Sequence, residues 1–339
     1  MTQLCTIIPP YLLDRLAELG DENARRSLAA DAALRTARAA LLPTAPPGGP
    51  AVRPGRTVAD AGGTTRLPGR TVRTEGGPPT GDPAVNRAYD GLGATLALLL
   101  EVYGRRSVDG EGLPLQATVH YGEDYDNAFW DGHRMVFGDG DRVVFRDFTG
   151  CIDVIGHELT HGVVQYSAAL AYRGQSGALN ESLADVFGSL VKQYALGQQA
   201  EDADWLIGAG LLGPGIRGVG LRSLKAPGTA YDDPRLGRDP QPASMDGYVE
   251  TDTDEGGVHL NSGIPNRAFY LTAVELGGAA WERAGRIWYD AMTGGRLRPD
   301  ADFTDFARTT VETARTRFGD GPVVAAVAGA WKQVGVTAQ

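Results

Sequence analysis

Apolar residues recur every three or four positions along much of the chain, which is the spacing of amphipathic helices. Residues 11–42 follow this pattern with a break at Gly20, and Asp21 is placed to cap the second of two helices. A helix is also predicted at 86–104. The last part of the chain is predicted to be mostly helical, with helices at 153–168, 177–196, 261–276, 279–293, 302–318 and 321–333.

Strand-like alternation of apolar and polar residues lies between these helical zones. It predicts strands at 116–122, 134–141 and 142–148, and a hairpin within residues 64–76. The stretch 43–56, PTAPPGGPAVRPGR, has the composition of an extended linker that a protease can reach. The pattern therefore predicts an α+β protein with a small helical leading segment, a linker, a β-rich lobe and an α-rich lobe.

Composition narrows the classes of partner. The 339 residues suffice for two or three domains, and the net charge of −10 argues against nucleic acid or an anionic membrane as the main partner. No apolar run approaches the roughly 20 residues that cross a bilayer. The start of the chain has no basic region followed by an apolar stretch, so we expect cytoplasmic synthesis without a Sec signal, with non-Sec secretion left open. The two cysteines, Cys5 and Cys151, cannot build a disulfide framework.

The stretch DVIGHELTHGVVQY holds two of the 5 histidines of the chain. His157 and His161 are four residues apart, so in a helix their rings share one face and can converge on one ion. Zinc takes histidine nitrogens, and its catalytic sites combine three protein ligands with a water. Glu158 lies about 100° around the helix from His157, where it reaches such a water rather than the metal. Two ordinary buried histidines are the alternative.

A third ligand is available in the stretch ALNESLADVFGSLV, which follows His161. Gly174 and Gly177 are predicted to break the chain before a second helix, on which Glu181 and Asp185 share a face. Two carboxylates in an otherwise apolar stretch need a cation or a donor. Glu181 fits as the third zinc ligand, and Asp185 fits as the carboxylate that holds the ring N–H of a ligand histidine. A solvated acidic stripe is the alternative.

The pattern His157-Glu158-x-x-His161 followed by Asn180-Glu181-x-x-x-Asp185 resembles the thermolysin family of zinc metalloendopeptidases. The segments VHYGEDYDNAFWDGHRMVFGDGD, AYRGQSGALNESLADVFG and GGVHLNSGIPNRAFYL resemble this family too, so the similarity covers most of the chain from about residue 86. The resemblance implies one catalytic Zn²⁺ ion. It also implies a two-lobed fold, with a β-rich N-terminal lobe, an α-helical C-terminal lobe and the zinc-site helix between them.

The resemblance also assigns catalytic roles outside the zinc motif. Tyr172 and His259 match the pair that stabilises the oxyanion, and a phenol and an imidazolium are suitable hydrogen-bond donors. Asp254 matches the carboxylate that orients this histidine and raises its pKa. His120 and His133 match no catalytic position and are interpreted as structural or exposed.

Further matches concern substrate and calcium. Asn127 and the Ala128 backbone match groups that hold the substrate main chain, and Arg222 matches the arginine behind the pocket for the residue after the scissile bond. That pocket is implied to be apolar and to favour bulky apolar residues, since its lining matches Phe145, Phe148 and Val154. Asp153 matches a calcium ligand, but Lys192 replaces an expected carboxylate. Its ammonium group would repel Ca²⁺, which argues against a double calcium site.

The leading stretch CTIIPPYLLDRL resembles the start of the short propeptide in the protealysin-like branch of the family, whose Pro-Pro-Leu element blocks the active-site cleft. Here the element reads Pro9, Pro10 and Tyr11. Two prolines fix an extended backbone that suits a peptide-binding cleft, although an ordinary turn before a helix has the same residues. Cys5 is either a zinc ligand of the latent form or a plain buried thiol.

These observations predict a zinc-dependent neutral endopeptidase in zymogen form, with Glu158 as general base, peptides or proteins as substrates and its own propeptide as an internal partner. The predicted division is a propeptide and linker at 1–50, the β-rich catalytic lobe at 51–165 and the α-helical lobe at 166–339. A zinc aminopeptidase is one alternative, although no Gly-x-Met-Glu-Asn motif is present to anchor a substrate amine. An inactive zinc-bearing binding protein is the other.

Overall fold

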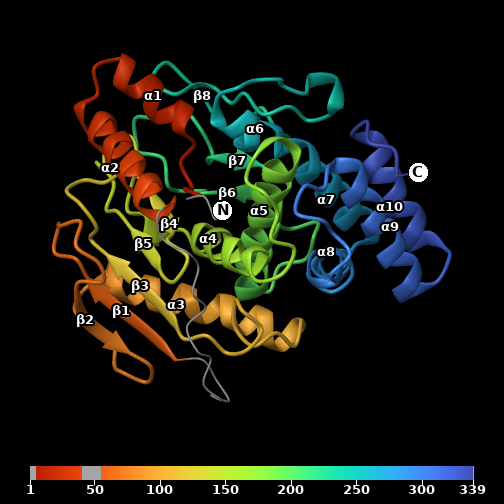
Figure 1. Cartoon of the computed structure of the whole chain (residues 1–339), viewed down its shortest axis with the longest axis horizontal. Coiled ribbons are helices and arrows are strands. Elements are labelled where there is room, and N and C mark those ends of the chain that lie inside the picture. Colours follow the sequence, from red (N-terminus) through yellow and green to blue (C-terminus); the bar gives the residue numbers. More distant parts are fainter. Residues whose placement is uncertain (1–4, 40–54, 339) are drawn as a thin grey trace.

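The computed structural model describes residues 5–39 and 55–338. Figure 1 shows the two N-terminal helices on the same side of the molecule as the main sheet, a pair of long helices in the middle, and the C-terminal helices on the side away from the sheet. Among the described residues, no helix is both long enough and apolar enough to span a membrane. The predicted α+β class, with a β-containing N-terminal part and a helical C-terminal part, is confirmed.

The main sheet belongs to the N-terminal half of the chain. Its strand order is β2-β1-β3-β5-β4, with β1, β3 and β5 parallel and the two outer strands antiparallel to their neighbours. The short strand β4 is therefore an edge, and its backbone can pair with another segment. The strands are β1 (Arg56–Asp60), β2 (Arg70–Thr74), β3 (Leu115–Val119), β4 (Ala128–Trp130) and β5 (Met135–Phe137).

Helix α3 (Pro83–Ala97) packs against β1 and β3 on one side and against the central helix α4 on the other. Its N-terminus is capped by Asp82, whose side chain accepts a hydrogen bond from the Ala84 amide at 2.8 Å. The helix continues as a π-helical turn, Leu98–Val102. The predicted helix at 86–104 is thus confirmed with small shifts of its ends.

Two central helices, α4 (Ile152–Gln165) and α5 (Gly174–Leu196), pack closely against each other. The contact between them is made at two glycines, Gly156 and Gly188. A methyl group added to Gly188 would lie 2.5 Å from the Asp153 carbonyl oxygen, and one added to Gly156 would lie 3.1 Å from the Gly188 Cα atom, so the backbones approach closely there. Any larger residue at Gly188 would push the helices apart. Nearly every residue of both helices is buried.

The C-terminal half is helical around an aromatic core. The Trp288 and Trp331 rings are stacked with their centroids 6.1 Å apart, and the Trp331 indole N–H donates to Thr310 Oγ1 at 2.9 Å. The helices are α6 (Asp254–Asn261), α7 (Gly263–Leu276), α8 (Ala284–Thr293), α9 (Phe303–Phe318) and α10 (Pro322–Gln333). Two-residue strand pairs precede them, β6 (Leu206–Ile207) with β7 (Arg222–Ser223) and β8 (Asp232–Asp233) with β9 (Gly237–Arg238).

The leading segment folds as the helix pair α1 (Pro10–Glu18) and α2 (Glu22–Ala39), which confirms the predicted break. Gly20 has φ of 91°, and the Asp21 carboxylate accepts hydrogen bonds from the amides of Asn23 and Ala24 at 3.0 and 3.1 Å. Arg15 donates from Nε to the Arg235 carbonyl at 2.9 Å. The inner face of α1 adds to the main core through Leu12, Leu13 and Leu16.

Several predicted elements are wrong or displaced. Residues 142–148 form no strand, because the chain turns there and only Phe145 makes a single bridge, to Leu212. Gly177 lies inside α5 rather than before it, and it is needed because a methyl group there would lie 2.4 Å from Val258 Cγ1. The predicted hairpin within residues 64–76 does not form. Strand β2 instead pairs with β1, which begins at Arg56, the last residue of the predicted linker. Residues 43–54 of that linker lie outside the described residues.

His120 ties the sheet to α3, and this contact predicts a pH-dependent stability. Its ring nitrogens lie 2.8 Å from carboxylate oxygens of Asp139 and Asp82, and the bond to Asp139, opposed by burial and helped by Asp82, raises its pKa from 6.5 to about 9. A histidine whose folded pKa is raised stabilises fully below its unfolded value and loses that effect as pH rises through the folded one. His120→Gln should therefore lower the free energy of unfolding by about 2 kcal/mol below pH 6.5 and by much less above about 9.

Unfolding in urea across that pH range measures the effect. His133→Gln serves as the matched control, because His133 is exposed and its substitution should leave stability nearly unchanged at every pH. A His120→Gln penalty that stays constant from pH 6.5 to above 9 would show that the ring contributes packing rather than charge.

Candidate active site

The two histidines of α4 face each other inside the molecule. Their Nε2 atoms lie 3.1 Å apart, and both side chains are almost completely buried. His157 Nδ1 lies 2.8 Å from Asp185 Oδ1, and His161 Nδ1 lies 2.9 Å from the amide oxygen of Asn180. Because both partners are acceptors, each Nδ1 carries a proton, which leaves Nε2 as the ring nitrogen that can offer a lone pair. Two lone pairs therefore point into the same small space.

Glu181 on α5 completes this set of acceptors. Its two oxygens lie 3.5 Å from His157 Nε2 and His161 Nε2, and its Oε2 atom is buried without a hydrogen bond. Burial alone would raise the pKa of Glu181, but the nearby His259, His161 and His157 lower it overall, so the group is a carboxylate. Burial lowers the pKa of His161 to about 4. Two imidazole nitrogens and a carboxylate oxygen that converge in this way fit a zinc ion.

Asp185 is the centre of a buried network behind His157. It receives hydrogen bonds from Arg222 Nε at 2.9 Å and from Asn266 Nδ2 at 2.9 Å, besides its contact with His157. Burial raises the pKa of Asp185, but the Arg222 guanidinium outweighs this effect and holds the pKa well below its usual range. The ionised carboxylate thereby fixes the tautomer and the orientation of His157.

Glu158 lies on the same helix but is held by different contacts. Its side chain is completely buried, and Oε2 accepts a hydrogen bond from the Trp130 amide of β4 at 3.0 Å. One carboxylate oxygen of Glu158 also lies within 4.8 Å of nitrogens of His157 and His161. A carboxylate at this distance can exchange a proton with a water that sits between it and the histidines.

Tyr172 and His259 come from segments outside α4 and meet at Glu181. The Tyr172 hydroxyl donates to Glu181 Oε1 and lies 3.3 Å from His259 Nε2. His259 Nδ1 lies 2.6 Å from Asp254 Oδ1, and its Nε2 lies 3.2 Å from the Thr6 carbonyl oxygen. Burial opposes a charge on His259, but Glu181 and Asp254 raise its pKa to about 9. The ring can therefore donate from both nitrogens.

Residues 6–8 of the leading segment lie in this site alongside β4, with a single bridge that resembles the pairing of an added strand. Thr6 forms an antiparallel bridge with Phe129 of β4, and the Ile7 amide donates to the Ala128 carbonyl at 3.1 Å. The Ile8 amide donates to Asn127 Oδ1 at 3.0 Å. The strand is gripped from the other side by Arg222, which donates to the Ile7 carbonyl at 3.0 Å.

The predicted proline element lies just beyond this strand. Pro9 precedes α1 with φ and ψ of −60° and 142°, and Pro10 is the first residue of the helix. Burial raises the pKa of Tyr11, and the nearby Tyr231 and Asp239 raise it further. The two prolines thus end the strand and begin the helix. The side chains of Phe145, Phe148 and Val154 are fully buried in the cluster that also contains Ile7 and Ile8.

Three polar residues of the site carried no predicted role. Asn180 orients His161, and its position beside Glu181 in an apolar helix was a usable signal. Asn266 donates to Asp185 and was hidden in a long helical pattern. Asp31 on α2 accepts from the Tyr125 hydroxyl and from Asn127 Nδ2, the latter at 3.0 Å. Nothing in the Ala-rich sequence around Asp31 pointed to this contact.

Lys192 joins the two central helices. Its ammonium donates to Asp153 Oδ2 at 2.8 Å and to the Leu206 carbonyl at 2.7 Å, and it lies 2.8 Å from Asp204 Oδ1. Burial lowers the pKa of Lys192, but Asp153 and Asp204 together more than offset this effect, so the pKa is raised overall. A fixed positive charge therefore sits beside the carboxylate that matches a calcium ligand.

Family models match two adjoining parts of the chain. The model described as thermolysin metallopeptidase, catalytic domain, matches residues 74–165, and the model described as thermolysin metallopeptidase, alpha-helical domain, matches residues 168–336. The first range ends with α4, and the second contains all residues from α5 to α10. Both helices that supply the facing acceptors are thus included.

Similar proteins cover nearly the whole chain. An extracellular metalloprotease of Pectobacterium carotovorum subsp. carotovorum is 52% identical over 98% of this chain and 96% of its own length. A thermolysin of Alicyclobacillus acidocaldarius is 40% identical over 75% of this chain and 46% of its own length. The solved precursor of protealysin, a metalloproteinase from Serratia proteamaculans, is 53% identical, covers 98% of this chain and 100% of that one, and superposes with a TM-score of 0.89.

The Lys192–Asp153 pair predicts stability that does not depend on calcium. Lys192→Met should lower the free energy of unfolding by about 3 kcal/mol, because it leaves a buried carboxylate without its cation. The exposed Lys225→Met is the matched control and should have little effect. Urea unfolding of the parent protein with and without a calcium-selective chelator completes the test. A marked loss of parent stability on calcium removal would contradict the assignment.

Proposed function

The chain belongs to the thermolysin family of zinc metalloendopeptidases, and on this premise we propose that it is the latent precursor of a neutral endopeptidase held by its own leading segment. The observation that carries the proposal is the strand at residues 6–8, which hydrogen-bonds on both sides as a peptide substrate would. The proposed division is a propeptide and linker at 1–50, a β-rich catalytic lobe at 51–165 and an α-helical lobe at 166–339.

His157, His161 and Glu181 are the proposed zinc ligands, because two imidazole nitrogens and the two oxygens of one carboxylate converge within 3.1 to 3.5 Å. A zinc ion bound there supplies a Lewis acid that makes a water nucleophilic at neutral pH. Glu158 takes a proton from the attacking water and passes it to the leaving amine. Its carboxylate is buried close to both histidines, but its side chain leaves α4 on a different face of the helix from theirs. Asp185 holds His157 in the required tautomer.

Tyr172 and His259 are the proposed oxyanion donors. The Thr6 carbonyl oxygen, 3.2 Å from His259 Nε2, marks where a substrate carbonyl would lie. An imidazolium and a phenol stabilise charge that develops on this oxygen, and Asp254 keeps the imidazolium in place. In the latent chain the Tyr172 hydroxyl instead donates to Glu181, so it must turn away from that carboxylate to reach the oxyanion.

The same strand suggests the specificity. If the Thr6 carbonyl stands for the scissile one, then Ile7 stands for the residue after the scissile bond. Ile7 is completely buried in the main hydrophobic core, to which Phe145, Phe148 and Val154 also belong, and its carbonyl is bound by Arg222. Bulky apolar residues are therefore the proposed preference at this position.

The two alternative functions lack such support. An aminopeptidase would need an acidic residue that binds the free amine of its substrate, at the position where the leading segment here continues from Thr6 to Cys5. The relatives are described as a metalloprotease and a thermolysin. An inactive binding protein would not need Glu158 at its buried position. Because the Pectobacterium relative is described as extracellular, we also propose that this chain acts outside the cell.

Matched glutamate variants separate catalysis from metal binding. Glu158→Gln should keep zinc but lose roughly 10²- to 10⁴-fold in the hydrolysis of an N-blocked peptide, because an amide cannot act as base. Glu181→Gln should weaken zinc affinity by at least about tenfold, because a neutral amide is a poorer ligand than a carboxylate. Metal analysis after competition with a chelator and peptide assays give both readouts. A zinc-free Glu158→Gln protein, or a Glu181→Gln protein with parental zinc affinity, would overturn the roles.

Latency is tested with Ile7→Asp in the full-length chain. A charge in a fully buried apolar cluster should weaken docking of the segment by at least about 2 kcal/mol, or roughly thirtyfold, so the uncut variant should hydrolyse peptides faster than the uncut parent by that factor. Glu18→Gln on the exposed face of α1 is the control. Replacing Pro9 and Pro10 by glycine should act in the same direction, because it frees the backbone between strand and helix.

Cleavage within residues 43–55 should raise the activity of the parent, and the released enzymes from all variants should have equal turnover. An uncut parent that already works at the released rate would show that the segment does not inhibit.

A further inference from the structure

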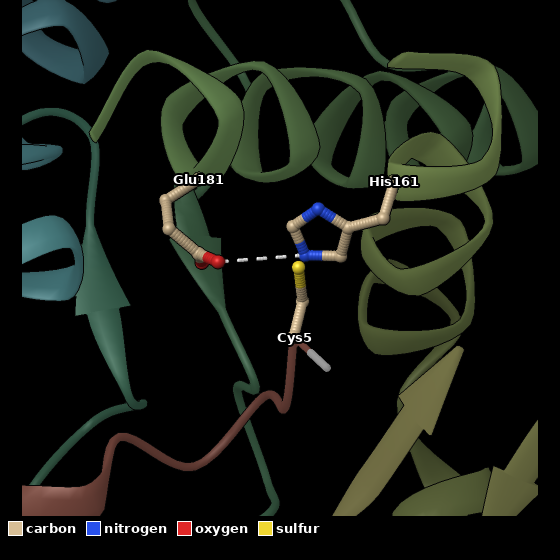
Figure 2. A group of neighbouring side chains, drawn as sticks. All are labelled: Cys5, His161 and Glu181. Atoms are coloured by element: carbon tan, nitrogen blue, oxygen red, sulfur yellow. Dashed lines mark ion pairs between the residues drawn. The ribbon is translucent and has the colours of Figure 1, made fainter. Parts of the chain in front are cut away.

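The side chain of Cys5 ends among the proposed zinc ligands. Its sulfur, a His161 nitrogen and a Glu181 oxygen all lie within 4.8 Å of one another, and Cys5 is 6% exposed. Figure 2 shows the sulfur directed at the ring nitrogen of His161 that faces Glu181. These three side chains come from the leading segment, α4 and α5, so only the folded full-length chain brings them together.

The position of Cys5 follows from the residues that come after it. Thr6 is held at both ends, by its bridge to Phe129 and by its carbonyl contact with His259 at 3.2 Å. Ile7 is held by Ala128 and Arg222. Cys5 itself packs in a small buried cluster with Tyr172 and Val258. The thiol is therefore placed by a hydrogen-bonded strand, one residue beyond the carbonyl that stands for the scissile one.

The three proposed zinc ligands around this thiol can be joined by a sulfur as the fourth ligand. Zinc in structural sites is closed by four protein ligands, often with sulfur among them, whereas catalytic sites leave one position for water. His157, His161 and Glu181 provide three ligands, and Glu181 Oε2 is buried without a hydrogen bond. A sulfur beside His161 and Glu181 would occupy the position that a catalytic water needs.

We propose that in the uncut chain Cys5 binds the catalytic zinc as its fourth ligand and so keeps water from the metal; this proposal rests on the zinc ligands assigned above. Binding breaks the S–H bond, the proton passes to solvent, and the sulfur lone pair forms the metal–sulfur bond, with no oxidant or reductant involved. The Thr6–Ile7 peptide bond then escapes hydrolysis although it lies in a substrate-like register. Removal of the leading segment takes the sulfur away and converts a closed site into an open one.

Cobalt substitution of the full-length protein tests the proposal, in a Glu158→Gln background that prevents self-cleavage. Cobalt bound to thiolate gives an intense near-ultraviolet charge-transfer band, and tetrahedral cobalt gives visible bands whatever its ligands. We expect both in the parent chain, and loss of only the charge-transfer band in Cys5→Ser. Cys151→Ser is the matched control and should keep both, because the Cys151 thiol is also buried but donates to the Ala209 carbonyl.

Two further readouts do not depend on the spectrum. Cys5→Ser should lower the zinc affinity of the uncut chain by at least about tenfold, measured by chelator competition. In the chain without the Cys5 substitution, the Cys5 thiol should be alkylated more slowly with zinc bound than after metal removal, which needs no variant that could misfold. Mass spectrometry of the modified peptides distinguishes Cys5 from Cys151.

The outcomes separate this proposal from the function on which it rests. Visible cobalt bands without a charge-transfer band in the parent, or equal alkylation of Cys5 with and without zinc, would overturn the fourth ligand and leave the zinc site intact. Cobalt binding that survives His161→Ala would instead overturn the zinc site itself. The expected pattern is loss of all cobalt bands in His161→Ala and loss of the charge-transfer band alone in Cys5→Ser.

Discussion

The close approach of α4 and α5 is the constraint on which the site depends. Gly156 and Gly188 add no side chain of their own where the two helices meet, and this allows acceptors from both helices to converge. Such a group of lone pairs repels itself in a buried setting unless a cation joins it. Asp185 and Arg222 strengthen the arrangement, because their buried ion pair orients His157 and reaches out to the leading segment at Ile7. Metal site and peptide recognition are thus one connected network.

The leading segment uses the edge of the sheet. Strand β4 has an unpaired side, and residues 6–8 add to it as a strand that runs antiparallel, which satisfies backbone groups on both partners. The helices α1 and α2 then secure this segment through contacts with the rest of the chain, such as those of Arg15 with Arg235 and of Asp31 with Asn127. Pro9 and Pro10 mark the change from strand to helix. The resemblance had placed the proline element in the active site, whereas the residues before it make the closest contacts.

The fold was predictable where the pattern was long and periodic. The six helices predicted after residue 152 are all present, because an apolar stripe over a dozen residues identifies a helix without knowledge of its partner. Short elements failed. Strand β4 has three residues, all buried, and so shows no alternation. Helix α6 contains four residues with positive φ, Asp254, Glu255, Gly256 and Gly257, which no helical pattern predicts. The alternating stretch 142–148 buries Val144, Phe145 and Phe148 but lies in a turn with one bridge rather than in a sheet.

The sequence by itself determined the chemistry of the site, because four-residue spacing places His157 with His161 on one face of any helix, and Glu181 with Asp185 on another. It also carried the resemblance that located Tyr172 and His259. Only the tertiary structure decided which residues meet across the chain: Asn180 with His161, Asn266 with Asp185, and Cys5 with Glu181. The spacing of residues along the sequence determines the directions in which their side chains leave one helix. Contacts between segments depend on how helices and strands pack, and that packing is set by close approaches such as Gly188 that a linear pattern does not express.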